Sequence, residues 1–204
     1  GDIFIAKYDT NGNYIWSKAM GGTNTDLSYE ITVDSSGQVY ISGFFQDTVD
    51  FDPSAATANL ISVGGQDIFI AKYDTNGNYI WAKAVGGAGV QNVNSIIIDA
   101  DDNLICTGYF QGTVDFDPSV SINNLTAAGG FDIFIAKYDP NGNYVWAKAI
   151  SGALSEYSSS IALDNSGQIY ITGNFQGTVD FDPSIANANN TSAGGSDIFI
   201  AKYN

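Results

Sequence analysis

Asp2-Ile-Phe-Ile-Ala-Lys-Tyr8 is the stretch that decides the fold of this chain, because the same seven residues return at Asp67, Asp132 and Asp197. The spacing is 65 residues each time. A fixed period of this size is typical of propellers, solenoids and arrays, in which each small unit packs on its neighbours. We therefore treat residues 1–204 as a single repeat array. Its units are 2–66, 67–131 and 132–196, followed by a partial fourth unit, 197–204.

The charge of the chain excludes some classes of partner. It carries 22 acidic and 7 basic residues, no His and a net charge of −15. Binding of nucleic acid needs a basic surface, so we expect no nucleic-acid partner. No apolar run is long enough to span a bilayer, so we expect no membrane insertion.

Within each unit, alternating and β-branched runs predict four strands, which we name A to D. In the first full copy we expect A over Ser28–Val33, B over Gln38–Phe44, C over Asp67–Tyr73 and D over Asn78–Ala84. Both faces of these strands are largely apolar, which is typical of small sheets packed between neighbours. The predicted fold is all-β, with four-stranded antiparallel propeller-type blades. Three copies plus one extra strand would form an open array or part of a larger propeller.

Tight turns join C to D and A to B. Gly12, Gly77 and Gly142 fit the left-handed position of a three-residue hairpin loop. Asp102 takes the same position in one A–B turn, where Asp is tolerated. In the first C–D hairpin this register places Tyr8 opposite Tyr14, Ala6 opposite Trp16, and Phe4 opposite Lys18.

The two longer connections lie at the opposite end of an antiparallel meander. They are the B–C loop, as in 45–66, and the D–A loop, as in 21–27. The copies differ most in the D–A loop, at 23–26, 88–91 and 153–156. Binding residues concentrate on loops held by a rigid scaffold, so this end is where we expect any specific ligand.

A repeated Thr-Val-Asp-Phe-Asp-Pro segment supplies the candidate metal ligands. Residues two apart on a strand point the same way, so each pair of Asp side chains offers oxygens that suit Ca²⁺. The competing interpretation is a turn cap before Pro. The possible calcium ligands are Asp50, Asp52, Asp115, Asp117, Asp180 and Asp182.

Other patterns favour structural roles. Asp9-x-Asn11-x-Asn13 resembles the start of a calcium loop, but Gly12 comes too early and a hairpin turn explains it. Trp16, Trp81 and Trp146 hold one strand position, so we expect blade-to-blade packing rather than sugar stacking. Lone Cys106 is interpreted as a buried apolar residue, and no disulfide is expected.

Catalysis has little support in the sequence. The chain has no His for general base work, and its two Glu residues, Glu30 and Glu156, stand alone along the sequence. A glycosidase needs two facing carboxylates. No acid–base group is singled out, so we expect no enzyme.

The quoted residues resemble a known family. Asp2-Ile-Phe-Ile-Ala-Lys-Tyr-Asp-Thr-Asn-Gly-Asn-Tyr-Ile-Trp16, together with Ile161-Ala-Leu-Asp-Asn-Ser-Gly-Gln-Ile-Tyr-Ile-Thr-Gly173, looks like the bacterial SBBP-type β-propeller repeat. Phe175-Gln-Gly-Thr-Val-Asp-Phe-Asp-Pro-Ser184 resembles its long-insertion form in secreted or cell-surface proteins. The resemblance covers essentially the whole chain and implies a four-stranded blade, an extracellular setting and no shared catalytic residues.

Two functions follow from these patterns. The first is a non-enzymatic structural or adhesive module of an extracellular bacterial surface protein or filament. It would assemble by packing repeat on repeat, within a longer array or with a neighbouring chain. The alternative is a ligand-binding propeller, with surface glycans as the ligand, using the B–C and D–A loops.

Overall fold

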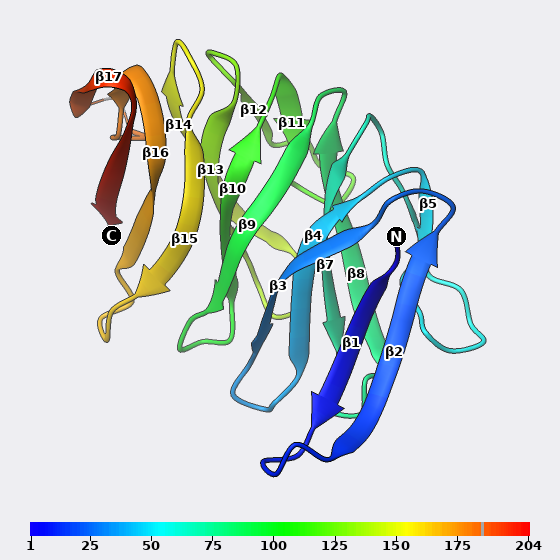
Figure 1. Cartoon of the computed structure of the whole chain (residues 1–204). Coiled ribbons are helices and arrows are strands. Elements are labelled where there is room, and N and C mark those ends of the chain that lie inside the picture. The colour runs from blue at the N-terminus through cyan, green and yellow to red at the C-terminus, as the bar shows by residue number, and fades with distance from the viewer. Residues whose placement is uncertain (185) are drawn as a thin grey trace.

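The computed structural model describes residues 1–184 and 186–204, and its regular elements are all β-strands (Figure 1). Two complete blades of four antiparallel strands stand in the middle of the array. One consists of β3 (Leu27–Val33), β4 (Val39–Phe45), β7 (Asp67–Tyr73) and β8 (Tyr79–Gly87). The other consists of β9 (Gln91–Ile98), β10 (Leu104–Phe110), β13 (Asp132–Tyr138) and β14 (Tyr144–Gly152). The predicted all-β blade fold is thus confirmed.

Partial blades flank this pair. The N-terminal one consists of β1 (Ile3–Tyr8) and β2 (Tyr14–Gly22), the C and D strands of a unit. The C-terminal one holds β15 (Tyr157–Leu163), β16 (Ile169–Asp180) and β17 (Asn189–Tyr203), which supply strands A, B and C. The A strands β3, β9 and β15 lie next to one another, so the blades fan out from a common side.

The B–C loop contains structure that the sequence analysis missed. Its Thr-Val-Asp segment forms a short hairpin, β5 (Thr48–Asp50) with β6 (Asn59–Ile61), and β11 (Thr113–Asp115) with β12 (Asn124–Thr126). This hairpin pairs with the last residues of the D strand in the preceding blade, as β5 does with β2. It therefore ties neighbouring blades together through backbone hydrogen bonds.

A glycine in the D strand makes this pairing with the hairpin possible. A Cβ atom on Gly22 would lie 2.3 Å from the carbonyl oxygen of Thr48, and one on Gly87 would lie 2.3 Å from that of Thr113. At this distance a Cβ atom would overlap the carbonyl oxygen, so a side chain cannot be accommodated. Glycine at this position lets the hairpin backbone approach the D strand.

The C–D register differs from the prediction. Tyr8 does pair with Tyr14, but Lys7, rather than Ala6, lies opposite Trp16. A register shift between Lys7 and Tyr8 causes this, and the same shift recurs in both complete blades. Such a bulge places two residues of one strand against one of the other. The predicted pairing of Phe4 with Lys18 is wrong for this reason, because Ile5 holds that place.

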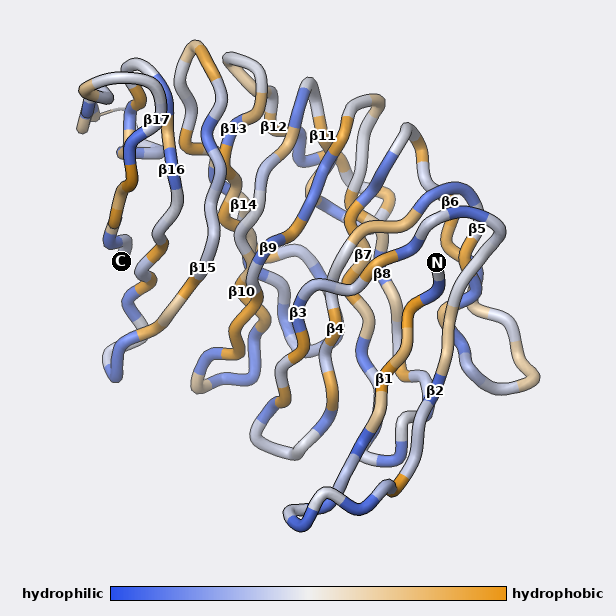
Figure 2. The backbone as a smooth tube through the Cα atoms, viewed as in Figure 1, coloured by the Kyte–Doolittle hydropathy of each residue, from blue (hydrophilic) through white to orange (hydrophobic). Residues whose placement is uncertain are grey.

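The hydrophobic core lies in the layers between blades. Apolar residues mark the strands and hydrophilic ones mark the tight turns at the lower end of the view (Figure 2). Phe51 and Phe116, from the insertion, are fully buried against Phe69 and Phe134 of strand C. Cys106 is a free, buried thiol, as predicted. Burial raises its pKa to about 12, so it is unreactive at neutral pH.

Candidate interaction site

At two joints between blades, a tryptophan and a lysine donate hydrogen bonds to the C–D turn of the next blade. Trp16 Nε1 and Lys7 Nζ donate to the carbonyl oxygen of Thr75 at 3.3 and 3.0 Å. Trp81 Nε1 and Lys72 Nζ donate to the carbonyl oxygen of Pro140, both at 3.2 Å. The tryptophans therefore pack at the joints, as expected, and each also supplies a hydrogen bond.

The glycine of the bound C–D turn packs against the same tryptophan and against a second lysine of the preceding blade. A Cβ atom on Gly77 would lie 3.0 Å from both Lys18 Cγ and Trp16 Cζ3. One on Gly142 would lie 3.1 Å from Lys83 Cγ and from the Trp81 ring. Charge adds to the fit, since Lys18 is one of the groups that lower the pKa of Asp74, after hydrogen bonds from the Asn78 backbone and side chain.

The outermost blades leave the same positions uncovered. Phe4 is 72% exposed, whereas the equivalent Phe69 is fully buried. Ile31 is 56% exposed against 6% for Ile96, and Ile198 is 88% exposed against 1% for Ile68. Because the residue type is unchanged, the difference comes from the absence of a covering blade among the described residues. Exposed apolar surface of this kind marks an interaction site.

One cavity, of about 320 Å³, lies on the N-terminal face between β1 and β3 and is lined by Phe4, Tyr8, Tyr29 and Ile31. Another, of about 380 Å³, lies between the second complete blade and the C-terminal partial blade, and its lining includes Ile135, Trp146, Lys148, Ile169 and Tyr203.

The candidate calcium ligands sit at turns in the B–C loop. Asp50 Oδ1 accepts from the backbone N–H of Asp52 and Ala58, and Asp52 Oδ1 accepts from that of Ser54. Asp115 with Asp117, and Asp180 with Asp182, repeat the arrangement. Hydrogen bonds from the Ser184 side chain and backbone hold the pKa of Asp182 below its usual value. These contacts fit turn caps, and calcium binding stays a prediction.

Glu156, which stands alone along the sequence, has a carboxyl neighbour in the fold. Its backbone N–H donates to the carbonyl oxygen of Phe131, which brings its side chain beside Asp132. Both carboxyl groups are fully buried. Glu156 Oε2 accepts from Gly152 N and Asp132 Oδ2 from Ala128 N, while Oε1 and Oδ1 have no donor. Burial raises the pKa of Glu156 to about 7, and the charge of Asp132 adds to the rise.

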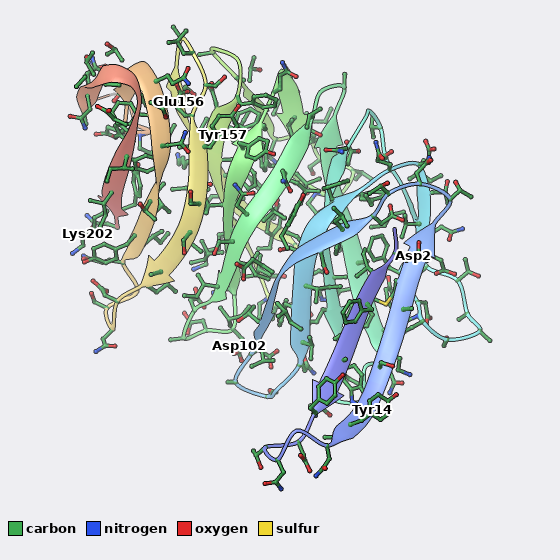
Figure 3. All side chains as sticks on the ribbon, viewed as in Figure 1. Asp2, Tyr14, Asp102, Glu156, Tyr157 and Lys202 are labelled. Atoms are coloured by element: carbon green, nitrogen blue, oxygen red, sulfur yellow. The ribbon has the colours of Figure 1, made fainter. Side chains whose placement is uncertain are left out.

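Aligning the repeat units by their 65-residue period singles out the position of Glu156. Residue 156 is equivalent to Gln91 and Asp26, and all three side chains are buried at the start of the A strand. In the middle copy Gln91 places an uncharged amide where Glu156 carries a carboxyl group. Glu156 and Tyr157 lie at the opposite end of the molecule from Asp102 and Tyr14 (Figure 3).

Three aromatic rings next to this pair form a cluster that does not recur at another joint among the described residues. Tyr109, Phe131 and Tyr157 pack edge-on or tilted, with centroids 5.0 to 5.6 Å apart. Their equivalents in the other copies are mixed, for example Gln66 and Ser196 in place of Phe131. The cluster is half-buried and lies at the end that carries the variable loops.

Two further findings concern the part of the chain that the structure describes. No three Asp, Glu, Cys or His side chains gather there as ligands for a metal ion. No helix there is long and apolar enough to cross a membrane.

Comparison with known proteins gives distant relatives and no family. No family model matches the chain. It is 27% identical over 96% of its length to an uncharacterized WD repeat-containing protein of Acanthamoeba polyphaga mimivirus. It is 23% identical over 85% of its length to the regulatory protein FlaEY of Caulobacter vibrioides. The chain spans only 16% and 18% of these proteins. The first relative supports a propeller-like repeat, and the bacterial SBBP assignment remains a resemblance.

Proposed function

We propose that this chain is a non-enzymatic protein-interaction module that assembles by packing repeat on repeat. The observation that carries the proposal is the pair of uncovered apolar faces. On them, residues such as Phe4 and Ile31 are exposed, although their equivalents are buried between the complete blades. The partner is therefore another unit of the same repeat, and it would cover these faces as neighbouring blades cover each other within the chain.

The groove between β1 and β3 borders the strand edge of β1 that faces away from β2. In the complete blades, strand C has strand B at one edge and strand D at the other, as β7 has β4 and β8. Among the described residues β1 pairs with β2 alone. The β15–β16 hairpin of another unit would supply the missing A and B strands. Strand edges and apolar faces of this kind favour association.

We propose further that the assembly is structural or adhesive and belongs to an extracellular bacterial surface protein or filament. The resemblance to secreted repeat proteins and the acidic composition support this setting. The printed name of one relative, a WD repeat-containing protein, supports an interaction role in general. Antibody labelling of intact source cells tests the location, and labelling seen only after cell lysis would contradict it.

Sedimentation velocity tests the assembly. We expect the chain to associate as its concentration rises. The double variant Phe4→Ser with Ile31→Ser should weaken association at least tenfold, because burial of each side chain contributes roughly 1.5 to 3 kcal/mol. The control, Val63→Ser with Val120→Ser, removes two apolar side chains that are even more exposed and lie in loops. A wild-type chain that stays monomeric, or equal effects of the two double variants, would refute the proposal.

A second candidate function, ligand binding at the variable-loop end, has one observation in its favour. Among the described residues the cluster of Tyr109, Phe131 and Tyr157 occurs at one joint, whereas a purely architectural feature would recur. Aromatic rings beside polar groups suit surface glycans. A broad glycan array probed with the intact chain tests this candidate, and an array without hits would remove it.

A further inference from the structure

Asp132 and Glu156 form a buried carboxyl pair at an internal joint of the array, where β13 begins in one blade and β15 in the next. Asp132 Oδ1 and Glu156 Oε1 are both buried without a hydrogen-bond donor. The ion pairs among the described residues join other groups, so neither carboxyl group has a lysine beside it. Buried charges in proteins are paired with an opposite charge or coordinate a metal ion. Such a pair lacks the positive charge that its burial requires.

The equivalent acid in the first unit satisfies both of its oxygens. Asp26 Oδ2 and Oδ1 accept from two backbone N–H groups, at 2.9 and 3.2 Å. Glu156 repeats only the first of these bonds, at 3.0 Å, and its Oε1 takes no second donor. The charge of Asp132 adds to burial in raising the pKa of Glu156, so the two carboxyl groups lie close together. The unpartnered oxygens are therefore specific to this pair of acids.

Three positions around the buried Asp gain an oxygen at this joint. The middle unit has Gly86, Val90 and Gln91 there, and the following unit has Ser151, Ser155 and Glu156. Ser151 follows Ile150, which pairs with Ile133, so the register carries Ser151 opposite Asp132. Ser155 Oγ accepts from the backbone N–H of Phe131 at 3.3 Å, directly before Asp132. Hydroxyl and carboxyl oxygens thus gather where the middle unit has a glycine, a valine and an amide.

Backbone carbonyl groups approach one another in the same loops. A Cβ atom on Gly129 would lie 2.4 Å from the oxygen of Leu154 and 2.7 Å from that of Gly152. A set of carboxylate, hydroxyl and carbonyl oxygens suits calcium, which takes six to eight oxygens at about 2.3 to 2.6 Å. The space between oxygens at that distance is narrower than a water molecule. Complete burial of the ligand oxygens is therefore compatible with an ion between them.

We propose that Asp132 and Glu156 bind a calcium ion at this joint through Oδ1 and Oε1. Hydroxyl and carbonyl oxygens of the adjoining loops complete its coordination. Two negative charges match one divalent cation, and the ion links the start of β13 to the start of β15. The equivalent pair of Asp67 with Gln91 carries one charge less and binds no ion. The site is separate from the Asp pairs of the B–C loop and does not depend on self-assembly.

Isothermal titration calorimetry with calcium chloride, on the intact chain stripped with EDTA, tests the site. We expect a binding step of one ion per chain that Glu156→Gln weakens at least tenfold. Gln occupies the equivalent position 91 in this fold, so the variant should fold. The control replaces one acid of each B–C loop pair, as Asp52→Asn, Asp117→Asn and Asp182→Asn together, and should leave this step unchanged.

Melting curves give a second measurement. Calcium should raise the melting temperature of the wild type and of the triple control variant, but not that of Glu156→Gln, because only a ligand of the folded state stabilises it. Without the ion, protonation of Glu156 reduces the charge instead, so pH titrations of the pair are made in EDTA. A wild-type chain that binds no calcium, or binding and melting that Glu156→Gln leaves unchanged, would overturn the inference.

Discussion

Glu156→Gln should make the protein less sensitive to pH between about pH 5 and 8, because it removes one of two facing buried carboxyl groups. In the folded chain the pKa of Glu156 rises from 4.5 to about 7, chiefly through burial. A carboxyl group whose pKa is raised by folding binds its proton more tightly in the folded state. Its contribution to stability is therefore complete below pH 4.5 and is lost as the pH rises through 7.

The size of the effect follows from that rise. Each tenfold change in an ionisation constant corresponds to about 1.4 kcal/mol, so the wild-type chain should lose roughly 2 to 3 kcal/mol relative to Glu156→Gln across this window. Gln91 holds the equivalent position beside Asp67 as a neutral amide, and the chain thus already contains the substituted form.

Urea unfolding of both proteins at several pH values measures the difference. Carboxyl groups far from Glu156 titrate alike in both chains and cancel. Gln91→Glu is the reciprocal control. It places a carboxyl group at the equivalent position one repeat earlier, and stability should gain a pH dependence of the same sign. A stability difference between wild type and Glu156→Gln that stays constant from pH 5 to 8 would refute the raised pKa of Glu156.

Three further predictions concern stability. Tyr138→Phe should cost roughly 1 to 3 kcal/mol of unfolding free energy, since Tyr138 donates to the buried carbonyl oxygen of Phe116 at 3.0 Å, while Tyr8→Phe should be neutral because Tyr8 is exposed. Thermal melts of both variants decide this, and equal losses would contradict it. Asp115→Ala removes the acceptor of two backbone N–H groups and should cost roughly 1 to 2 kcal/mol, equally in millimolar calcium and in EDTA. A loss confined to the calcium buffer would instead identify a metal ligand. Gly77→Asn should cost roughly 1 to 3 kcal/mol of unfolding free energy, because Trp16 and Lys18 fill the space beside Gly77. Urea unfolding measures this loss against that of Gly12→Asn, where the space is open. Equal losses in the two variants would contradict close packing at the joint.

The 65-residue period made most of the fold predictable from the sequence. Local signals sufficed for the strands and for the turns at Gly12 and Asp102, which do have φ of +81° and +60°. The bulge after Lys7 was missed because nothing in the residue pattern shows a one-residue shift that preserves the Tyr8–Tyr14 pair. The insertion hairpins were missed because three-residue strands have no periodicity to detect, and their partner is in the preceding blade.

The buried pair of Asp132 and Glu156 escaped for a different reason. The two residues belong to one unit but lie at the junction of two blades, and their proximity depends on how blades pack. Alignment of residues 26, 91 and 156 by the period would have grouped an acid, an amide and an acid at one position. Their burial is visible only in the fold.

Electron microscopy of the concentrated native chain tests the central claim most directly, which is that the uncovered faces bind further units of the same repeat. The account predicts closed rings or filaments in which blades continue at a constant spacing across chain boundaries. Isolated short arcs at every concentration, each the size of a single chain, would contradict it.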